Sequence, residues 1–158
     1  MFYFFSWVEQ LFYREDKMLE NKKAELQGDH ETYKAYVSLM EGCVAAWNRS
    51  DAEATAAFYA EDLDYRDPNL PNGIHSREKF TKYLRILFRL WPEQQWTGKI
   101  ILPHAKPGAF SISYNFRFAN GRKSIQGFGI DRLEFEGDKI KLNHVYLNAD
   151  QWPHWIKQ

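Results

Sequence analysis

The chain has 158 residues, a length typical of one domain with a single core. Aromatic residues make up 17% of it and charged residues 27%, a balance that excludes a disordered chain. Lys plus Arg and Asp plus Glu number 21 each, and no basic run stands among aromatic residues, so we expect no nucleic-acid partner. The one cysteine, Cys43, cannot form an internal disulfide, no Cys/His spacing indicates a metal site, and we expect a cytoplasmic protein.

Residues 1–30 are predicted to form a helical N-terminal extension. Residues 9–28 are rich in the helix formers Glu, Lys, Gln and Leu, and residues 28–30 are expected to break the helix. The apolar run at residues 1–8 is too short to span a bilayer, and no basic face accompanies it, so we expect no membrane partner. The domain itself is predicted over residues 31–158.

Three helices are predicted in this domain. From residue 31 apolar side chains recur at three-and-four spacing as far as Trp47, which indicates an amphipathic helix. A short helix over 52–59 follows, with Ser50 or Asp51 as its cap. The third is predicted over 77–90, with Ser76 as its cap and Pro92 as its stop.

Five strands account for most of the remaining chain. The first is short, at 63–66, and four more are predicted at 94–102, 110–118, 124–135 and 139–148, followed by a Trp-rich tail at 149–157 with a helical turn. Helices followed by a meander indicate an α+β fold with the helices on one face of the sheet. We expect a cone-like α+β barrel, in which a curved antiparallel sheet wraps around the N-terminal helices and leaves a pocket at the open end.

Asp131 is the first candidate for chemistry. Along 124–135 one face carries Ile125, Gly127, Gly129, Asp131, Leu133 and Phe135, and it is apolar except for the aspartate. Glycines inside a strand remove side-chain volume, so Gly127 and Gly129 indicate space for a ligand. Apolar surroundings disfavour an ionised carboxylate, which would let Asp131 donate a proton near neutral pH. A structural aspartate satisfied by Arg117, Arg132 or a tyrosine is the alternative.

Asp67 is the second candidate. It ends the first short strand, just before Pro68 and a loop rich in Pro, Gly and Asn. An ordinary turn aspartate is one interpretation, because aspartate commonly precedes proline in turns. The other is a general base at the mouth of the pocket, paired with a protonated Asp131.

These motifs carry a resemblance to a known family. Residues 58–68, 73–78 and 129–140 resemble the nuclear transport factor 2-like superfamily, and within it the SnoaL-like polyketide cyclases and the ketosteroid isomerases. The resemblance covers residues 31–150. It implies the same cone-like fold, commonly dimeric through the sheet, so a homodimer is expected.

The resemblance also implies roles for single residues. Asp67 matches the proton-abstracting aspartate of the isomerases, and Asp131 matches their protonated aspartate and the acid/base aspartate of the cyclases. Tyr59 matches a tyrosine that supports the oxyanion network. The main oxyanion tyrosine of the isomerases falls at Cys43 here, which argues against steroid isomerisation because a thiol is a weak donor. The pocket is expected to be lined by Tyr59, Cys43, Trp47, Leu84, Tyr114, Phe116, Gly127 and Gly129.

Three functions remain open from the sequence. The first is an isomerase, cyclase or lyase that uses no cofactor or metal and acts on a small hydrophobic carbonyl or polyketide-like compound through Asp67 and Asp131. The second is a non-catalytic protein that binds a small hydrophobic molecule in the same pocket. The third is a dimeric interaction domain that uses the aromatic face of its sheet.

Overall fold

The computed structural model describes residues 3–148, and for residues 3–16, 19 and 22–28 it describes only the backbone. The tail predicted at 149–157 therefore lies outside the described residues. The chain divides into two compact units, residues 1–36 and 37–158, which are taken separately below.

The first unit is helical. Helix α1 spans Tyr3–Asn48, and this unit contains its N-terminal part. The break predicted at residues 28–30 is wrong, because α1 continues through Gly28. A glycine inside a helix costs roughly 1 kcal/mol relative to alanine, which the helix formers on both sides offset. The domain boundary at residue 30 stays a prediction. Within residues 3–148 no helix is both long enough and apolar enough to cross a bilayer.

Two further helices belong to the second unit. Helix α2 (Ala52–Ala56) is capped by Asp51, whose carboxylate accepts from the amide of Ala54 at 2.9 Å. It is shorter than predicted because a strand begins at Tyr59. Helix α3 (Arg77–Leu90) matches its predicted bounds and is capped by the predicted Ser76.

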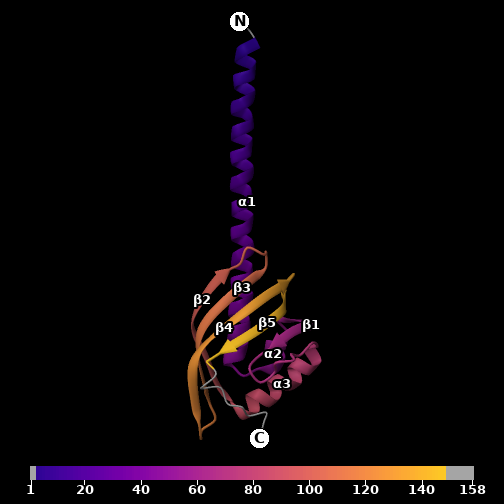
Figure 1. The fold of residues 1–158 in the computed structure, drawn as a ribbon, viewed down its shortest axis with the longest axis vertical. Coiled ribbons are helices and arrows are strands. Elements are labelled where there is room, and N and C mark those ends of the chain that lie inside the picture. Colours follow the sequence, from indigo (N-terminus) through magenta and orange to yellow (C-terminus); the bar gives the residue numbers. More distant parts are fainter. Residues whose placement is uncertain (1–2, 149–158) are drawn as a thin grey trace. The chain divides into compact units, whose positions relative to one another are not determined.

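Five strands form one sheet in the order β1-β5-β4-β3-β2 (Figure 1). The strands are β1 (Tyr59–Arg66), β2 (Glu93–Pro103), β3 (Ala109–Ala119), β4 (Ser124–Glu136) and β5 (Lys139–Leu147). Strands β2 to β5 form the predicted antiparallel meander. The sheet differs from the predicted antiparallel arrangement at one edge, where β1 pairs in parallel with β5. Parallel neighbours require a long crossover, and here α3 and three strands return the chain to β1.

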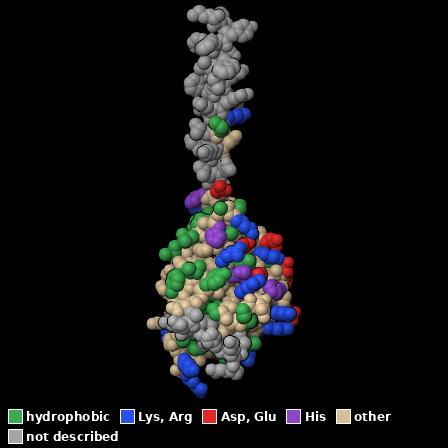
Figure 2. Space-filling model, viewed as in Figure 1, with side chains coloured by type: hydrophobic (Ala, Val, Ile, Leu, Met, Phe, Trp, Pro, Cys, Tyr) green, Lys and Arg blue, Asp and Glu red, His purple; other side chains and the backbone are tan. Residues whose placement is uncertain are grey.

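The curved sheet stays open, since β1 and β2 are its two edges. Its inner face is apolar, as the alternation in β3 and β4 predicted: Gly129 and Leu133 are buried, whereas Phe128 and Ile130 are exposed. Figure 2 shows hydrophobic side chains gathered on the outer face. The fold is the predicted cone-like α+β arrangement, with the C-terminal part of α1 against the inner face.

Candidate functional site

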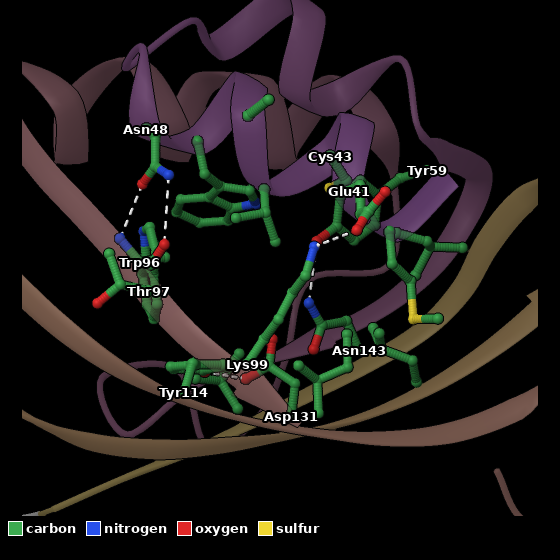
Figure 3. Close-up of a pocket in the computed structure, with 18 of the residues that line it drawn as sticks. Glu41, Cys43, Asn48, Tyr59, Trp96, Thr97, Lys99, Tyr114, Asp131 and Asn143 are labelled. Atoms are coloured by element: carbon green, nitrogen blue, oxygen red, sulfur yellow. Dashed lines mark hydrogen bonds and ion pairs between the residues drawn. The ribbon is translucent and has the colours of Figure 1, made fainter. Parts of the chain in front are cut away.

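A cavity of about 350 Å³ lies inside the second unit, between the C-terminal part of α1 and the inner face of the sheet (Figure 3). This volume is within the range of small-molecule sites, roughly 300–1,000 Å³. Its lining is mainly apolar, with contributions from Met40, Trp47, Ile112, Leu133 and Val145. A few polar groups converge on this apolar wall, and these define the chemistry.

Asp131 lies on the cavity wall, as its position in the strand predicted. The hydroxyl of Tyr114, on the neighbouring strand β3, donates a hydrogen bond to its Oδ1. Burial raises the pKa of Asp131 to about 7, although hydrogen bonds from Tyr114 and Asn143 lower it in part. Near neutral pH the carboxyl group is therefore divided between its protonated and ionised forms, so that it can donate or accept a proton.

Gly129 has a different role from the one predicted. A Cβ at this position would stand 2.5 Å from both Cε2 of Tyr114 and Cδ2 of Leu147. The space that the glycine leaves is filled by these two side chains, so it is not open to a ligand. Neither Gly129 nor Gly127 lines the cavity. The glycine instead lets the Tyr114 ring lie against β4 and reach Asp131.

A buried polar cluster borders the cavity on the side of α1 and β5. Asn143 Nδ2 donates to the hydroxyl of Tyr59 at 2.9 Å, and Asn143 Oδ1 is buried without a hydrogen-bond partner among the described residues. Burial raises the pKa of the Cys43 thiol to about 12 and that of Tyr59 well above its usual value. Both groups stay protonated at neutral pH, which makes Cys43 a poor nucleophile.

Asp67 does not line the cavity. Its Oδ1 accepts from the amides of Asn69 and Leu70 at 2.8 and 3.0 Å, and its Oδ2 accepts from the hydroxyls of Tyr65 and Tyr83. Burial raises the pKa of Asp67, and these four hydrogen bonds oppose the rise. Tyr65 both contacts Asp67 and lines the cavity, so Asp67 connects to the site through this tyrosine. This is the geometry of a buried turn aspartate, and a role as base stays a prediction.

The remaining predicted pocket residues divide into two groups. Cys43, Trp47, Tyr59 and Tyr114 line the cavity. Leu84 and Phe116 are almost fully buried but do not line it. Leu84 lies in α3, which packs on α2 and β1. Phe116 packs in an aromatic cluster with Trp96 and Phe118, at ring-centroid distances of 6.0 and 5.2 Å.

Several polar residues of the cavity were not anticipated from the sequence, among them Asn143, Lys99 and Glu41. Asn143 lies on β5, where both faces looked mixed. Lys99 of β2 and Glu41 of α1 form an ion pair, with 2.9 Å between Nζ and Oε1, and both line the cavity. Gly98 is a sequence signal for the position of Lys99. A glycine within a strand often marks a bulge, and a bulge changes the face on which the next side chain lies. Among the side chains that the structure describes, no group of three or more His, Cys, Asp or Glu could hold a metal ion.

Solved structures share this fold. A presumed polyketide cyclase from Xanthomonas campestris pv. campestris superposes with a TM-score of 0.66 at 20% identity, over 80% of this chain and 98% of the other. AclR, a presumed hydroxylase from Streptomyces galilaeus, gives 0.60 at 17% identity over 73% and 76%. A nuclear transport factor 2-like protein of unknown function from Burkholderia pseudomallei gives 0.63 at 11% identity over 73% and 92%.

No curated protein matches the sequence. The family model of the SnoaL-like domain matches residues 40–143, which include the whole sheet from β1 to the middle of β5 and most of the cavity wall. Because this match covers more than half of the chain, the protein belongs to the SnoaL-like family of the nuclear transport factor 2-like superfamily.

Proposed function

We propose that the protein is an acid/base enzyme of cyclase type that acts on a small hydrophobic carbonyl or polyketide-like compound, with Asp131 as the group that moves the proton. The observation that carries this proposal is Asp131 itself: a carboxyl group on the wall of an apolar cavity, with a pKa raised to about 7. Such a group is matched to proton transfer at neutral pH. Proton transfer of this kind requires no cofactor.

One carboxyl group is sufficient when the substrate is already enolised. Protonated Asp131 donates its proton to a ketone oxygen while the enol carbon of the same molecule attacks the ketone carbon. The carbonyl π bond breaks, a carbon–carbon bond forms, and the ketone becomes an alcohol. The enol oxygen becomes a carbonyl and releases its proton, which the Asp131 carboxylate takes up. The product is an aldol ring, and the enzyme is restored.

Tyr114 and the apolar wall contribute to this step. The Tyr114 hydroxyl donates a hydrogen bond to Oδ1 of Asp131, which holds the carboxyl group on the cavity wall. The apolar side chains keep water from the reacting atoms, where a hydrogen bond to developing charge is stronger than in water.

A second candidate is a binding protein that catalyses no reaction. The position of Asp67 favours it, because the expected base has both oxygens engaged in hydrogen bonds and does not line the cavity. A pocket in which one carboxyl group titrates near neutral pH suits recognition of a carbonyl oxygen as well as it suits catalysis. The two candidates share the ligand class and differ only in turnover.

One experiment separates them. Linear triketones and tetraketones are incubated with the wild type, with Asp131→Asn and with the control Asp138→Asn. Asp138 lies in the turn between β4 and β5, is exposed, and pairs with Lys139. Catalysis predicts ring products, detected by mass spectrometry, that are lost in Asp131→Asn and kept in Asp138→Asn. A thermal shift with no product in any protein would support binding alone, and equal turnover in all three would exclude Asp131 as the acid.

We also infer a homodimer through the outer face of the sheet. Five large apolar side chains are at least 40% exposed there on three strands: Ile100, Leu102, Phe128, Ile130 and Tyr146. Ile100 and Ile130 both pair with Ser113, and Ile130 also pairs with Tyr146, so these side chains form a band across the sheet. A contiguous apolar band on a surface marks an interface, and a second copy would cover it with the same chemistry.

A further inference from the structure

Strand β2 contains a bulge beside the cavity. Thr97 pairs with Asn115 and Ile100 pairs with Ser113, so Gly98 and Lys99 together stand opposite the single residue Tyr114. Gly98 has a φ of +64°, a left-handed conformation that favours glycine. A glycine in this conformation as the first residue of the extra pair is the pattern of a G1 bulge, which redirects the side chains that follow it.

The bulge decides where Lys99 lies. Before it, Gln94 and Trp96 are on the inner face, so regular alternation would place Gly98 and Ile100 there as well. After it, Ile100 lies on the outer face and is 60% exposed, while Ile101 pairs with the inward Ile112. Lys99 is thereby brought to the cavity wall instead of to the outer face. Bulges are over-represented at sheet edges and next to active sites, and β2 is an edge strand that lines the cavity.

Lys99 and Glu41 are the two charged groups at this wall besides Asp131. Figure 3 shows the Lys99 side chain reaching from β2 to Glu41 on α1. The two side chains differ in exposure, at 32% for Lys99 and 55% for Glu41. The stem of Lys99 is therefore held against the wall, whereas Glu41 can turn out into water at little cost.

We propose that Lys99 is a specificity residue that binds a carboxylate group of the substrate, so that the cavity takes small apolar carboxylic acids. The ligand's carboxylate takes the place of Glu41 on the Lys99 ammonium, and the charge balance at the wall is unchanged. The apolar body of the ligand then fills the cavity towards Asp131. This inference shares one assumption with the proposed function, namely that the substrate binds in the cavity.

A carboxylate fits this site better than an amine does. An amine would have to pair with Glu41 and displace Lys99, the less exposed of the two side chains. Displaced Lys99 would then lack a counter-charge beside the apolar wall, which is costly. Displaced Glu41 regains hydration, because more than half of its side chain is already exposed.

The test measures binding to matched probes. The affinities of 2-naphthoate, its neutral amide 2-naphthamide and the cation 2-naphthylmethylamine are measured by titration calorimetry. The proteins are the wild type, Lys99→Met, Glu41→Gln and Gly98→Ala, with Lys82→Met as control. Lys82 forms a similar exposed ion pair with Glu78 on α3, away from the cavity. Gly98→Ala keeps the charge of Lys99 but strains the bulge that places it.

The wild type is expected to prefer the naphthoate to the amide, and increasingly so at low salt. Lys99→Met should weaken naphthoate binding about fivefold and leave amide binding unchanged, while Glu41→Gln should tighten naphthoate binding about threefold. Gly98→Ala should reduce the preference for naphthoate, and Lys82→Met should not.

Three results would overturn the proposal. The first is that the wild type binds naphthoate no more tightly than the amide. The second is that Lys99→Met weakens the binding of naphthoate and of the amide equally. The third is that the wild type prefers the amine and that Glu41→Gln abolishes this preference. Because these are binding measurements, they are independent of turnover. A selective cavity that converts no triketone would count against the acid/base chemistry of Asp131 and leave the role of Lys99 intact.

Discussion

The ring of Tyr114 lies against Gly129 of the neighbouring strand, and its hydroxyl donates to Oδ1 of Asp131, two residues further along that strand. Tyr114 and Gly129 are direct cross-strand partners, so the missing side chain is what allows this contact. Gly129 does not line the cavity itself, but it allows Tyr114 and Asp131 to meet on the cavity wall. Tyr114 belongs to β3, whereas Gly129 and Asp131 belong to β4, the next strand along the chain.

This contact predicts the effect of Gly129→Ala. The new Cβ would stand 2.5 Å from atoms of Tyr114 and Leu147, so one or both side chains must move. Overpacking of this kind costs roughly 1–3 kcal/mol of unfolding free energy. Urea denaturation measures that loss, and carboxyl-carbon NMR should show that the pKa of Asp131 has changed with its hydrogen bond. Tyr114→Phe serves as control, since it removes the hydrogen bond and keeps the ring. An unchanged stability in Gly129→Ala would contradict the contact.

The raised pKa of Asp131 predicts a stability that depends on pH. The folded protein holds this proton up to about pH 7, whereas the unfolded chain loses it near pH 4. Unfolding free energy should therefore fall as the pH rises from about 4 to about 7, by on the order of 4 kcal/mol from this group. Asp131→Asn lacks the titration, so it should match the wild type near pH 4 and exceed it above pH 7. Parallel curves for the two proteins from pH 4 to 8 would show that the pKa is not raised.

The same group predicts how turnover varies with pH. If Asp131 acts as the acid, the active enzyme is the protonated form, so kcat/KM should be constant below about pH 7 and fall above it. Tyr114→Phe removes a hydrogen bond that lowers this pKa, so the fall should move to higher pH. Initial rates with a fixed triketone across pH 5 to 9 measure both profiles. A rate that rises through pH 7 would instead assign Asp131 as a base.

Asp67 is predicted to matter for folding more than for catalysis. Asp67→Ala removes the acceptor of two backbone amides and two tyrosine hydroxyls at a buried position, which should cost roughly 2–4 kcal/mol of unfolding free energy. Asp67→Asn keeps an acceptor for the two amides and should keep most of the turnover while folded. Thermal unfolding and rates below the melting temperature measure the two effects. Loss of turnover in a fully folded Asp67→Asn protein would restore the role of Asp67 as the base.

The apolar outer face predicts a dimer that a single charge can disrupt. Ile130→Lys places a charge in the middle of the band, and sedimentation should then report a monomer at concentrations where the wild type is dimeric. Ile86→Lys is the matched control, because Ile86 of α3 is 50% exposed outside the sheet. Monomeric wild type would contradict the interface, as would equal dissociation of both variants.

Local patterns were enough to predict several elements. The bounds of α3, its cap at Ser76, the alternation of β3 and the inward face of β4 with Asp131 all follow from side-chain periodicity and capping chemistry. These features depend on residues close in the chain, and the hydrophobic effect acts on them in any compact fold. The cone-like arrangement followed from the resemblance and from the order of helices and strands.

Features that depend on distant pairs could not be predicted in this way. The parallel pairing of β1 with β5 joins strands far apart in sequence. The Tyr83 hydroxyl reaches Oδ2 of Asp67 because α3 packs against β1, and no local pattern contains that contact. The same applies to Gly129, whose vacant space is taken by Tyr114 and Leu147.

The amino-acid order by itself determined which side chains can transfer a proton or form a hydrogen bond, and which face of each strand is apolar. Both are properties of short stretches of sequence. Only the tertiary structure decided which of these groups share a cavity. It placed Asp131 there with Lys99, and it placed Asp67 behind Tyr65. The reason is geometric. A single extra residue at Gly98 reverses the direction of the side chains that follow it, which brings Lys99 to the cavity. The packing of α3 against β1 brings Tyr83 to Asp67.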